Sequence, residues 1–126
     1  MTTRPNAYLL ACLCERLHVK LYVEHDRDSA LPYLPELRAL IGTPPRGDIS
    51  IVGAEGRAIY YELCGKTRLA LRWRLWEIAR MKLLYADIKK HAYKASTIRF
   101  MLQGRDRSVL EARKRIVRSL RRKLKR

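Results

Sequence analysis

The chain has 126 residues, of which 48% are hydrophobic, and it carries a net charge of +16 with a pI near 10.4. This length suits one domain, or a domain with a tail, and allows a sizeable core. The excess of positive charge indicates a polyanionic partner, DNA or RNA rather than an anionic membrane. The longest apolar run near the start, Tyr8 to Cys14, is too short to span a bilayer, so no transmembrane segment is expected.

The charge is concentrated in the second half of the chain. Residues 1–63 hold 7 of the 28 basic and 8 of the 12 acidic residues, whereas residues 64–126 hold the remaining 21 basic and 4 acidic residues. Cys12, Cys14 and Cys64 form no paired CxxC motif, so we expect no structural zinc site and no cofactor. The odd number of thiols and the lack of a signal peptide indicate an intracellular origin.

The first half predicts two helices and a hairpin. Residues 5–23 favour a helix opened by Pro5, although the alternation in HVKLYV also suits a strand. A loop (HDRDSALP) and a short helix over residues 33–41, closed by Gly42, come next. After the connector TPPRG, the stretch GDISIVGAEGRAIYYELCGK contains two β-rich runs around a Gly-bearing turn, which predicts a β-hairpin.

The second half predicts a long helix over residues 67–93, a short strand over 97–102, a turn, and a basic amphipathic helix over 108–125. The plan is therefore α+β, with a scaffold domain at residues 1–104 and a basic C-terminal helix at 105–126 packed on it. The alternative is an all-α fold in which residues 48–63 are helix or loop. The apolar stripe of the last helix consists of Val109, Ile116, Val117, Leu120 and Leu124.

The hairpin has the spacing of a metal-dependent nuclease site. A strand places residues i and i+2 on one face, so a (D/E)-x-K strand presents a carboxylate beside an ammonium group, and an Asp on the paired strand completes a Mg²⁺ site. Here Asp48 begins the first strand, and Glu62-Leu63-Cys64 stands where (D/E)-x-K belongs. A thiol with a pKa of about 8.5 is largely neutral at neutral pH. Cys64 therefore cannot replace the lysine, and we predict no catalytic residue and no enzyme.

These segments resemble the PD-(D/E)xK nucleases of the RecB type, in particular the CRISPR-associated exonuclease family. AYLLACLCERLHVKLY is similar to the opening segment of that family, TIRFMLQGRDRSV to its late strand and turn, and Tyr85 in MKLLY to the tyrosine of its Gln-x-x-x-Tyr motif. Met81 replaces the glutamine of that motif, and no cysteine follows Cys64 to hold the family's iron–sulfur cluster. The resemblance implies an inactivated relative with degenerate nuclease positions at Asp48, Glu62, Cys64 and Tyr85.

The resemblance also implies a function and a location for such a relative. An inactivated exonuclease of this kind is thought to serve as the nucleocapsid protein of a filamentous archaeal virus, in the virion and, during assembly, in the host cytoplasm. That function needs a multimer, formed by this chain alone or with a second coat protein. The capsid proteins of related filamentous archaeal viruses look all-helical, which is the reason for the all-α alternative.

The basic half supplies the predicted nucleic-acid contacts. The tail SVLEARKRIVRSLRRKLKR combines an apolar stripe with more Arg and Lys than the chain can neutralise. No base-reading motif is visible, so we expect binding to the phosphates of double-stranded DNA, without sequence specificity and steeply dependent on salt. One subunit would neutralise on the order of eight base pairs, a ratio that suits packaging. The predicted contacts are Arg68, Arg72, Arg80, Lys89, Lys90, Arg113, Lys114, Arg115, Arg118, Arg121, Arg122, Lys123, Lys125 and Arg126.

Two other functions stay open. If Asp48 and Glu62 still bind Mg²⁺, the chain is a DNA exonuclease or its accessory subunit. If the phosphates belong to structured RNA, it is an RNA-binding protein of the ribosomal type, because composition does not distinguish the two nucleic acids.

Overall fold

The computed structural model describes residues 3–42, 50–91 and 107–126, and every element in these ranges is helical. The predicted α+β fold is therefore wrong, and the all-α alternative holds for the described residues. The predicted strand over 97–102, the connector TPPRG and the domain boundary at residues 104 and 105 lie outside the described residues. The elements are α1 (Thr3–His18), η1 (Val19–Val23), α2 (Arg27–Ala30), η2 (Leu31–Tyr33), α3 (Leu34–Ile41), α4 (Ile51–Leu63), α5 (Thr67–His91) and α7 (Arg107–Lys125).

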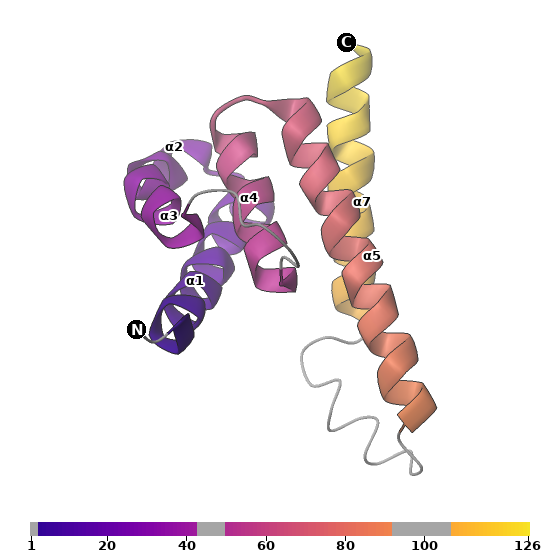
Figure 1. Ribbon diagram of the computed structural model, residues 1–126. Helices are drawn as coiled ribbons and strands as arrows, with labels where there is room; N and C mark the ends of the chain where they lie inside the picture. The colour runs from indigo at the N-terminus through magenta and orange to yellow at the C-terminus, as the bar shows by residue number, and fades with distance from the viewer. Residues whose placement is uncertain (1–2, 43–49, 92–106) are drawn as a thin grey trace.

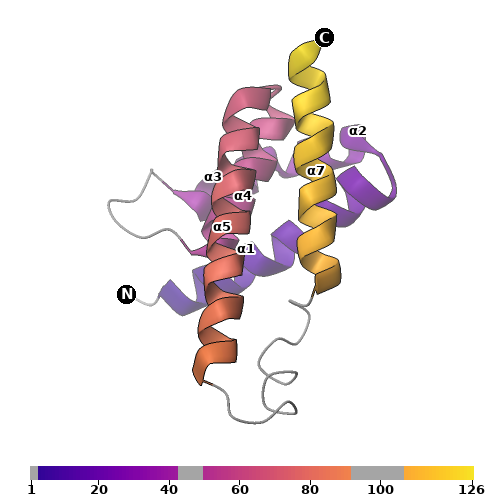
Figure 2. The ribbon, with the colours of Figure 1, turned by 90° about the vertical axis from the view of Figure 1, so that its right-hand side faces the viewer.

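Helix α4 joins two groups of helices (Figure 1). On one side it packs against α1 and α3, and on the other it packs against α5. Helices α5 and α7 run antiparallel beside each other and form one side of the molecule, which faces the viewer in Figure 2. The C-terminus consequently lies at the end where α5 begins, and most of the basic residues lie on this one pair of helices.

The predicted β-hairpin is wrong, because residues 51–63 form α4. Ser50 begins the helix as its N-cap, and its hydroxyl accepts a hydrogen bond from the Gly53 N–H at 3.0 Å. Gly53 and Gly56, the glycines of the predicted hairpin turn, lie inside the helix, and α1 and α3 come very close at Gly56. A Cβ atom on Gly56 would lie 2.9 Å from Ile41 Cγ2 and 3.1 Å from Leu10 Cδ1. The small residues in this stretch therefore allow close helix packing instead of a chain reversal.

The N-terminal helix is confirmed, and it continues through Val23 with a π-helical turn, η1. The strand alternative for HVKLYV is thus wrong. A π turn inserts an extra residue into the helix and redirects the side chains around it. Here the rings of His18 and Tyr22 lie with centroids 5.0 Å apart. The predicted short helix is also confirmed as α3, closed by Gly42 at φ 63°, a value that glycine tolerates best.

Two apolar clusters hold the helices together. The larger one joins α1, α3 and α4 through residues such as Leu17, Leu37 and Ile59, each with no exposed surface. The smaller one joins α5 to α7 through Ala70, Ile116 and Leu120, with Tyr22, Tyr61 and Leu71 packed against it. The predicted C-terminal helix is confirmed as α7, and Ile116, Val117 and Leu120 of its stripe are buried, whereas Leu124 is 38% exposed. Within the described residues, no helix is both long and apolar enough to cross a membrane.

Replacing Gly56 by valine tests the close packing around α4. The added side chain has no space against Ile41 and Leu10, so we expect the free energy of unfolding to fall by about 1–3 kcal/mol, as for other overpacked cores. Denaturant unfolding measures the change. Ala79→Val, which adds the same branched side chain at an exposed position of α5, should cost less than about 1 kcal/mol. Equal effects of the two substitutions would contradict this packing.

Candidate nucleic-acid interface

The two sides of α7 differ sharply. Ile116, Val117 and Leu120 are buried against the neighbouring helices, whereas Arg115, Arg118 and the residues from Arg121 to the end are exposed. This division follows the 3.6-residue helical period of the sequence. The apolar side docks the helix and thereby holds the cationic side outward, along the outer side of the α5–α7 pair.

Most of the predicted contacts are exposed cations without an acidic partner. No carboxylate of the described residues lies within 4.0 Å of their charged groups, so their charge is available to a polyanion. We call this set the outer cations. It consists of Arg68, Arg72, Lys89 and Lys90 of α5, and of Arg115, Arg118, Arg121, Arg122, Lys125 and Arg126 in and after α7.

Four predicted contacts are placed differently. Lys114 lies 3.5 Å from Glu111, and Lys123 lies 3.7 Å from Glu62, so a carboxylate already accompanies each ammonium group. Arg80 is half-buried, with its guanidinium 5.7 Å from the centroid of the Trp76 ring. Arg113 is the clearest correction, because its side chain is 13% exposed and lies in a buried ionic network.

The outer cations of α7 are fewer than the phosphates of an equal length of duplex, but of the same order. From Arg115 to Arg126 the helix extends roughly 16 Å at about 1.5 Å per residue. DNA carries one phosphate charge per about 1.7 Å of its axis, or about ten over that length. Six of the outer cations lie in this segment, and arginine predominates among them. Arginine suits phosphate because its planar guanidinium forms paired hydrogen bonds to two oxygens.

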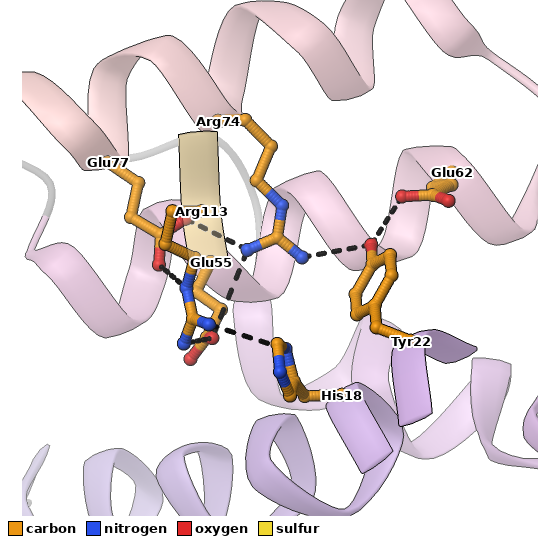
Figure 3. Close-up of polar contacts among 7 residues, drawn as sticks. All are labelled: His18, Tyr22, Glu55, Glu62, Arg74, Glu77 and Arg113. Carbon is orange, nitrogen blue, oxygen red and sulfur yellow. Dashed lines mark hydrogen bonds and ion pairs between the residues drawn. The ribbon is translucent and has the colours of Figure 1, made fainter. Parts of the chain in front are cut away.

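A buried ionic network lies beneath this surface (Figure 3). Its centre is Arg74 of α5, which has no exposed side-chain surface and donates a hydrogen bond to Glu77 at 2.8 Å. The second nitrogen of its guanidinium donates to the Tyr22 hydroxyl at 3.0 Å. Glu55 of α4 lies 3.9 Å from the first nitrogen. One arginine of the long helix thus contacts groups from α4 and η1.

Arg113 adds α7 to the network. Its Nε donates to Glu77 at 3.0 Å, and a terminal nitrogen donates to Glu55 at 2.6 Å. The other terminal nitrogen lies 3.4 Å from Nδ1 of His18 in α1. Two arginines and two glutamates therefore neutralise each other, and together they tie α7 to α1, α4 and α5. A buried arginine needs such partners, because an unpaired charge in the interior is strongly destabilising.

The ionisation of the neighbouring groups follows from this environment. Burial, together with the charges of Arg113 and Arg74, lowers the pKa of His18 to about 4, so the imidazole is neutral at neutral pH. Burial and then the nearby Glu77 raise the pKa of Glu55, against the opposing effect of the two arginines. Burial also raises the pKa of Tyr22, whose hydroxyl donates to Glu62. Tyr22 is therefore a neutral donor that connects Arg74 to Glu62.

The degenerate nuclease positions that the structure describes, Glu62, Cys64 and Tyr85, form no site together. Glu62 and Cys64 are two residues apart at the end of a helix, where successive side chains turn by about 100°, so they point to different sides. Tyr85 is half-buried in α5, and Asp48 lies outside the described residues. Within the described ranges, no group of three or more His, Cys, Asp and Glu side chains could hold a metal ion. The hairpin geometry that motivated a nuclease site is thus replaced by a helix whose Glu62 accepts a hydrogen bond from Tyr22.

The sequence prediction missed most of the network, although one signal was present. Arg74 and Glu77 occupy the same helix face as the buried Ala70 and Met81, at spacings of three and four residues. An arginine and a glutamate on an otherwise apolar face indicate an internal ion pair. Glu55 and His18 carried no comparable signal, because their proximity depends on how α1, α4 and α7 pack.

Arg113→Met should destabilise the protein by about 3–5 kcal/mol, because it leaves Glu55 and Glu77 short of their positive partners in the interior. The matched control is Arg118→Met, five residues further along the same helix and exposed, with an expected change within about 0.5 kcal/mol. Denaturant unfolding of both variants gives the comparison. If the two variants were equally stable, Arg113 would not be the internal anchor of α7.

His18 makes stability depend on pH. The unfolded chain takes up the imidazole proton as the pH falls below about 6.5, but the folded protein does so only near pH 4. The contribution of neutral His18 is therefore complete above about pH 6.5 and is lost as the pH falls toward 4. Glu55 acts in the opposite direction, because the folded state binds its proton more readily. In His18→Gln we expect a smaller loss of unfolding free energy between about pH 7 and about pH 5 than in the unaltered protein. Parallel pH curves for the two proteins would rule out this role.

Comparisons with known proteins complete the description. No protein-family model, no curated protein and no solved structure matches this chain.

Proposed function

We propose that this protein binds double-stranded DNA through its phosphates and packages it, as the nucleocapsid protein of a filamentous archaeal virus. The observation that supports the proposal is the set of outer cations, which lie on one pair of helices without carboxylate partners. A protein with a net charge of +16 that gathers its unpaired cations in this way has high affinity for a polyanion and little selectivity for sequence.

Two features favour packaging over regulation. The cations contact phosphates and not base edges, because no described element presents a base-reading motif. The charge of one subunit corresponds to a short length of duplex, on the order of eight base pairs, so many copies are needed to cover a genome. The viral assignment is the most specific part of the proposal, and it is supported by the all-helical fold of the described residues, because the hairpin behind the nuclease resemblance is a helix.

The experiment compares two double variants with the same loss of charge. Arg118→Gln combined with Arg122→Gln removes two outer cations of α7, whereas Arg16→Gln combined with Arg38→Gln removes two exposed arginines of the N-terminal helices. The affinity for an arbitrary duplex is measured by fluorescence anisotropy between about 50 and about 200 mM salt. We expect the α7 variant to bind at least tenfold more weakly and to lower the salt slope by about two. The control should stay within about threefold of the unaltered protein.

The outcomes separate the hypotheses. Equal losses in the two variants would mean that only net charge matters and that α7 is not the interface. A marked preference for structured RNA over duplex DNA at the same salt would replace the packaging proposal with the RNA-binding one. Cleavage of labelled duplex on addition of Mg²⁺, abolished by Glu62→Ala, would overturn the proposal in favour of the nuclease.

A further inference from the structure

A cleft of about 560 Å³ lies between the π-helical turn η1 and helix α7. One wall consists of residues between His18 and His25, and the other consists of residues of α7 between Ala112 and Lys123. Glu62, near the end of α4, also lines the cleft, and Figure 3 shows it beside the hydroxyl of Tyr22. Sites for small ligands typically have volumes of about 300–1,000 Å³, so a ligand group has room here.

The α7 wall presents two arginines on one face of the helix. Since an α-helix turns by about 100° per residue, Arg115, Ser119 and Arg122 lie within about 60° of one another around its axis. All three line the cleft. Both arginines are exposed, and no carboxylate of the described residues lies within 4.0 Å of their guanidinium groups. Their charges are therefore available to a ligand in the cleft.

The cleft has an excess of positive charge. Among the described residues that line it, Glu62 is the only carboxylate, and it already has two partners. Tyr22 donates a hydrogen bond to it, and the ammonium group of Lys123 lies 3.7 Å from it. Glu62 and Lys123 thus compensate each other, and the charges of Arg115 and Arg122 remain. An anion that enters the cleft meets two uncompensated cations.

Two uncharged donors complete the lining. His25 follows η1 with φ at 54°, in the left-handed region, and the next residue, Asp26, caps α2, so the backbone holds His25 in place between two helical elements. An imidazole carries at least one N–H, and the hydroxyl of Ser119 can donate its O–H. Neither side chain makes a hydrogen bond within the described part of the chain. His18 adds no charge at neutral pH, because burial and then Arg113 lower its pKa to about 4.

We propose that this cleft is a phosphate-binding site, in which Arg115 and Arg122 hold a phosphate group from the α7 wall and His25 and Ser119 donate further hydrogen bonds to it. Guanidinium groups form paired hydrogen bonds to phosphate oxygens, and a phosphate has enough acceptor oxygens for the two neutral donors as well. This inference rests on the proposed function, in which the phosphate belongs to the backbone of the bound nucleic acid. A free phosphate compound, such as a nucleotide, has the same chemistry, so the experiments separate the two sources.

A phosphate in the cleft fixes how the protein lies on a duplex. The other outer cations of α7 belong to a single exposed helix and attract phosphates in many positions. In the cleft, one phosphate is contacted from two walls, by α7 and by the end of η1. Phosphate contacts of this kind set the position and orientation of a protein without reading sequence. A fixed orientation of each copy is what a regular nucleoprotein needs.

Two neighbouring arginines of α7 provide a matched comparison. Arg122→Gln and Arg121→Gln remove the same charge from exposed positions, but Arg121 does not line the cleft. The affinity for a duplex of about 20 base pairs without terminal phosphates is measured by fluorescence anisotropy at about 100 mM salt. We expect Arg122→Gln to bind about tenfold more weakly and Arg121→Gln about twofold more weakly. Equal losses would mean that Arg122 contributes only its charge, and the cleft would not be a site for the duplex.

A double-mutant cycle tests whether the two walls hold the same phosphate. His25→Gly removes the imidazole, and glycine adopts the left-handed backbone of this position without strain, so the fold is kept. In the unaltered background His25→Gly should weaken duplex binding about fivefold, but in the Arg122→Gln background it should do so less than about twofold, because the shared phosphate is already poorly held. If the two losses simply multiplied, His25 and Arg122 would not share a phosphate, and the two-walled site would be wrong.

Inorganic phosphate identifies the site without DNA. In NMR spectra of the nitrogen-15-labelled protein, phosphate should shift the amide signals of His25 and Ser119 more than that of Arg121, and chloride at the same ionic strength should not. Displacement of the phosphate by the duplex would assign the cleft to the nucleic-acid backbone, and persistence of the phosphate would assign it to a free phosphate compound. If phosphate shifts these signals but the protein ignores DNA, the proposed function fails while the phosphate site stands. If neither phosphate nor the duplex shifts them, the cleft binds no phosphate and the inference fails.

Discussion

The buried ionic network of Arg74, Arg113, Glu55 and Glu77 is the constraint on which the rest of the structure depends. Its carboxylates come from α4 and α5 and its guanidinium groups from α5 and α7, so the network satisfies its charges only when these three helices are in place. The cost of leaving any one of these charges unpaired in the interior makes that arrangement specific. His18 adds α1 to it, and as a neutral imidazole it introduces no further buried charge.

The network explains how so basic a chain folds around arginine. Arg57 and Arg74 are buried like core residues, and each is compensated, Arg57 by the carbonyls of Gly53 and Ile41 and Arg74 by Glu77. The buried carboxylates of Glu55 and Glu77 pair with Arg74 and Arg113. Among the described residues few acidic groups therefore remain near the outer cations, whose charge stays uncompensated and available to phosphates. Internal neutrality and external charge are two consequences of the same distribution of glutamates.

The packing of α7 also orients its charge. Ile116, Val117 and Leu120 are buried, and Arg113 is held by Glu55 and Glu77, so the outer cations of the helix face outward. In the proposed function, a bound polyanion neutralises the net charge that would otherwise keep copies of the protein apart.

Local chemistry was sufficient to predict several elements. The period of the apolar residues predicted α1, α5 and α7, and Gly42 predicted the end of α3, because each of these signals acts within a few turns of helix. The concentration of cations in the second half predicted an exposed cationic surface, since charges on an amphipathic helix need no tertiary partner to face solvent. Most of the predicted contacts on α7 are exposed for this reason.

Tertiary packing decided the rest. The run from Ile51 to Leu63 has β-forming side chains, yet it is a helix, because its glycines and alanines allow α1 and α3 to approach it more closely than larger residues would. Arg113 has the same local sequence pattern as its exposed neighbours. It is internal only because Glu55 and Glu77 of other helices lie against it. Helical period and charge are properties of neighbouring residues, but the partner of a buried charge is set by which helices meet.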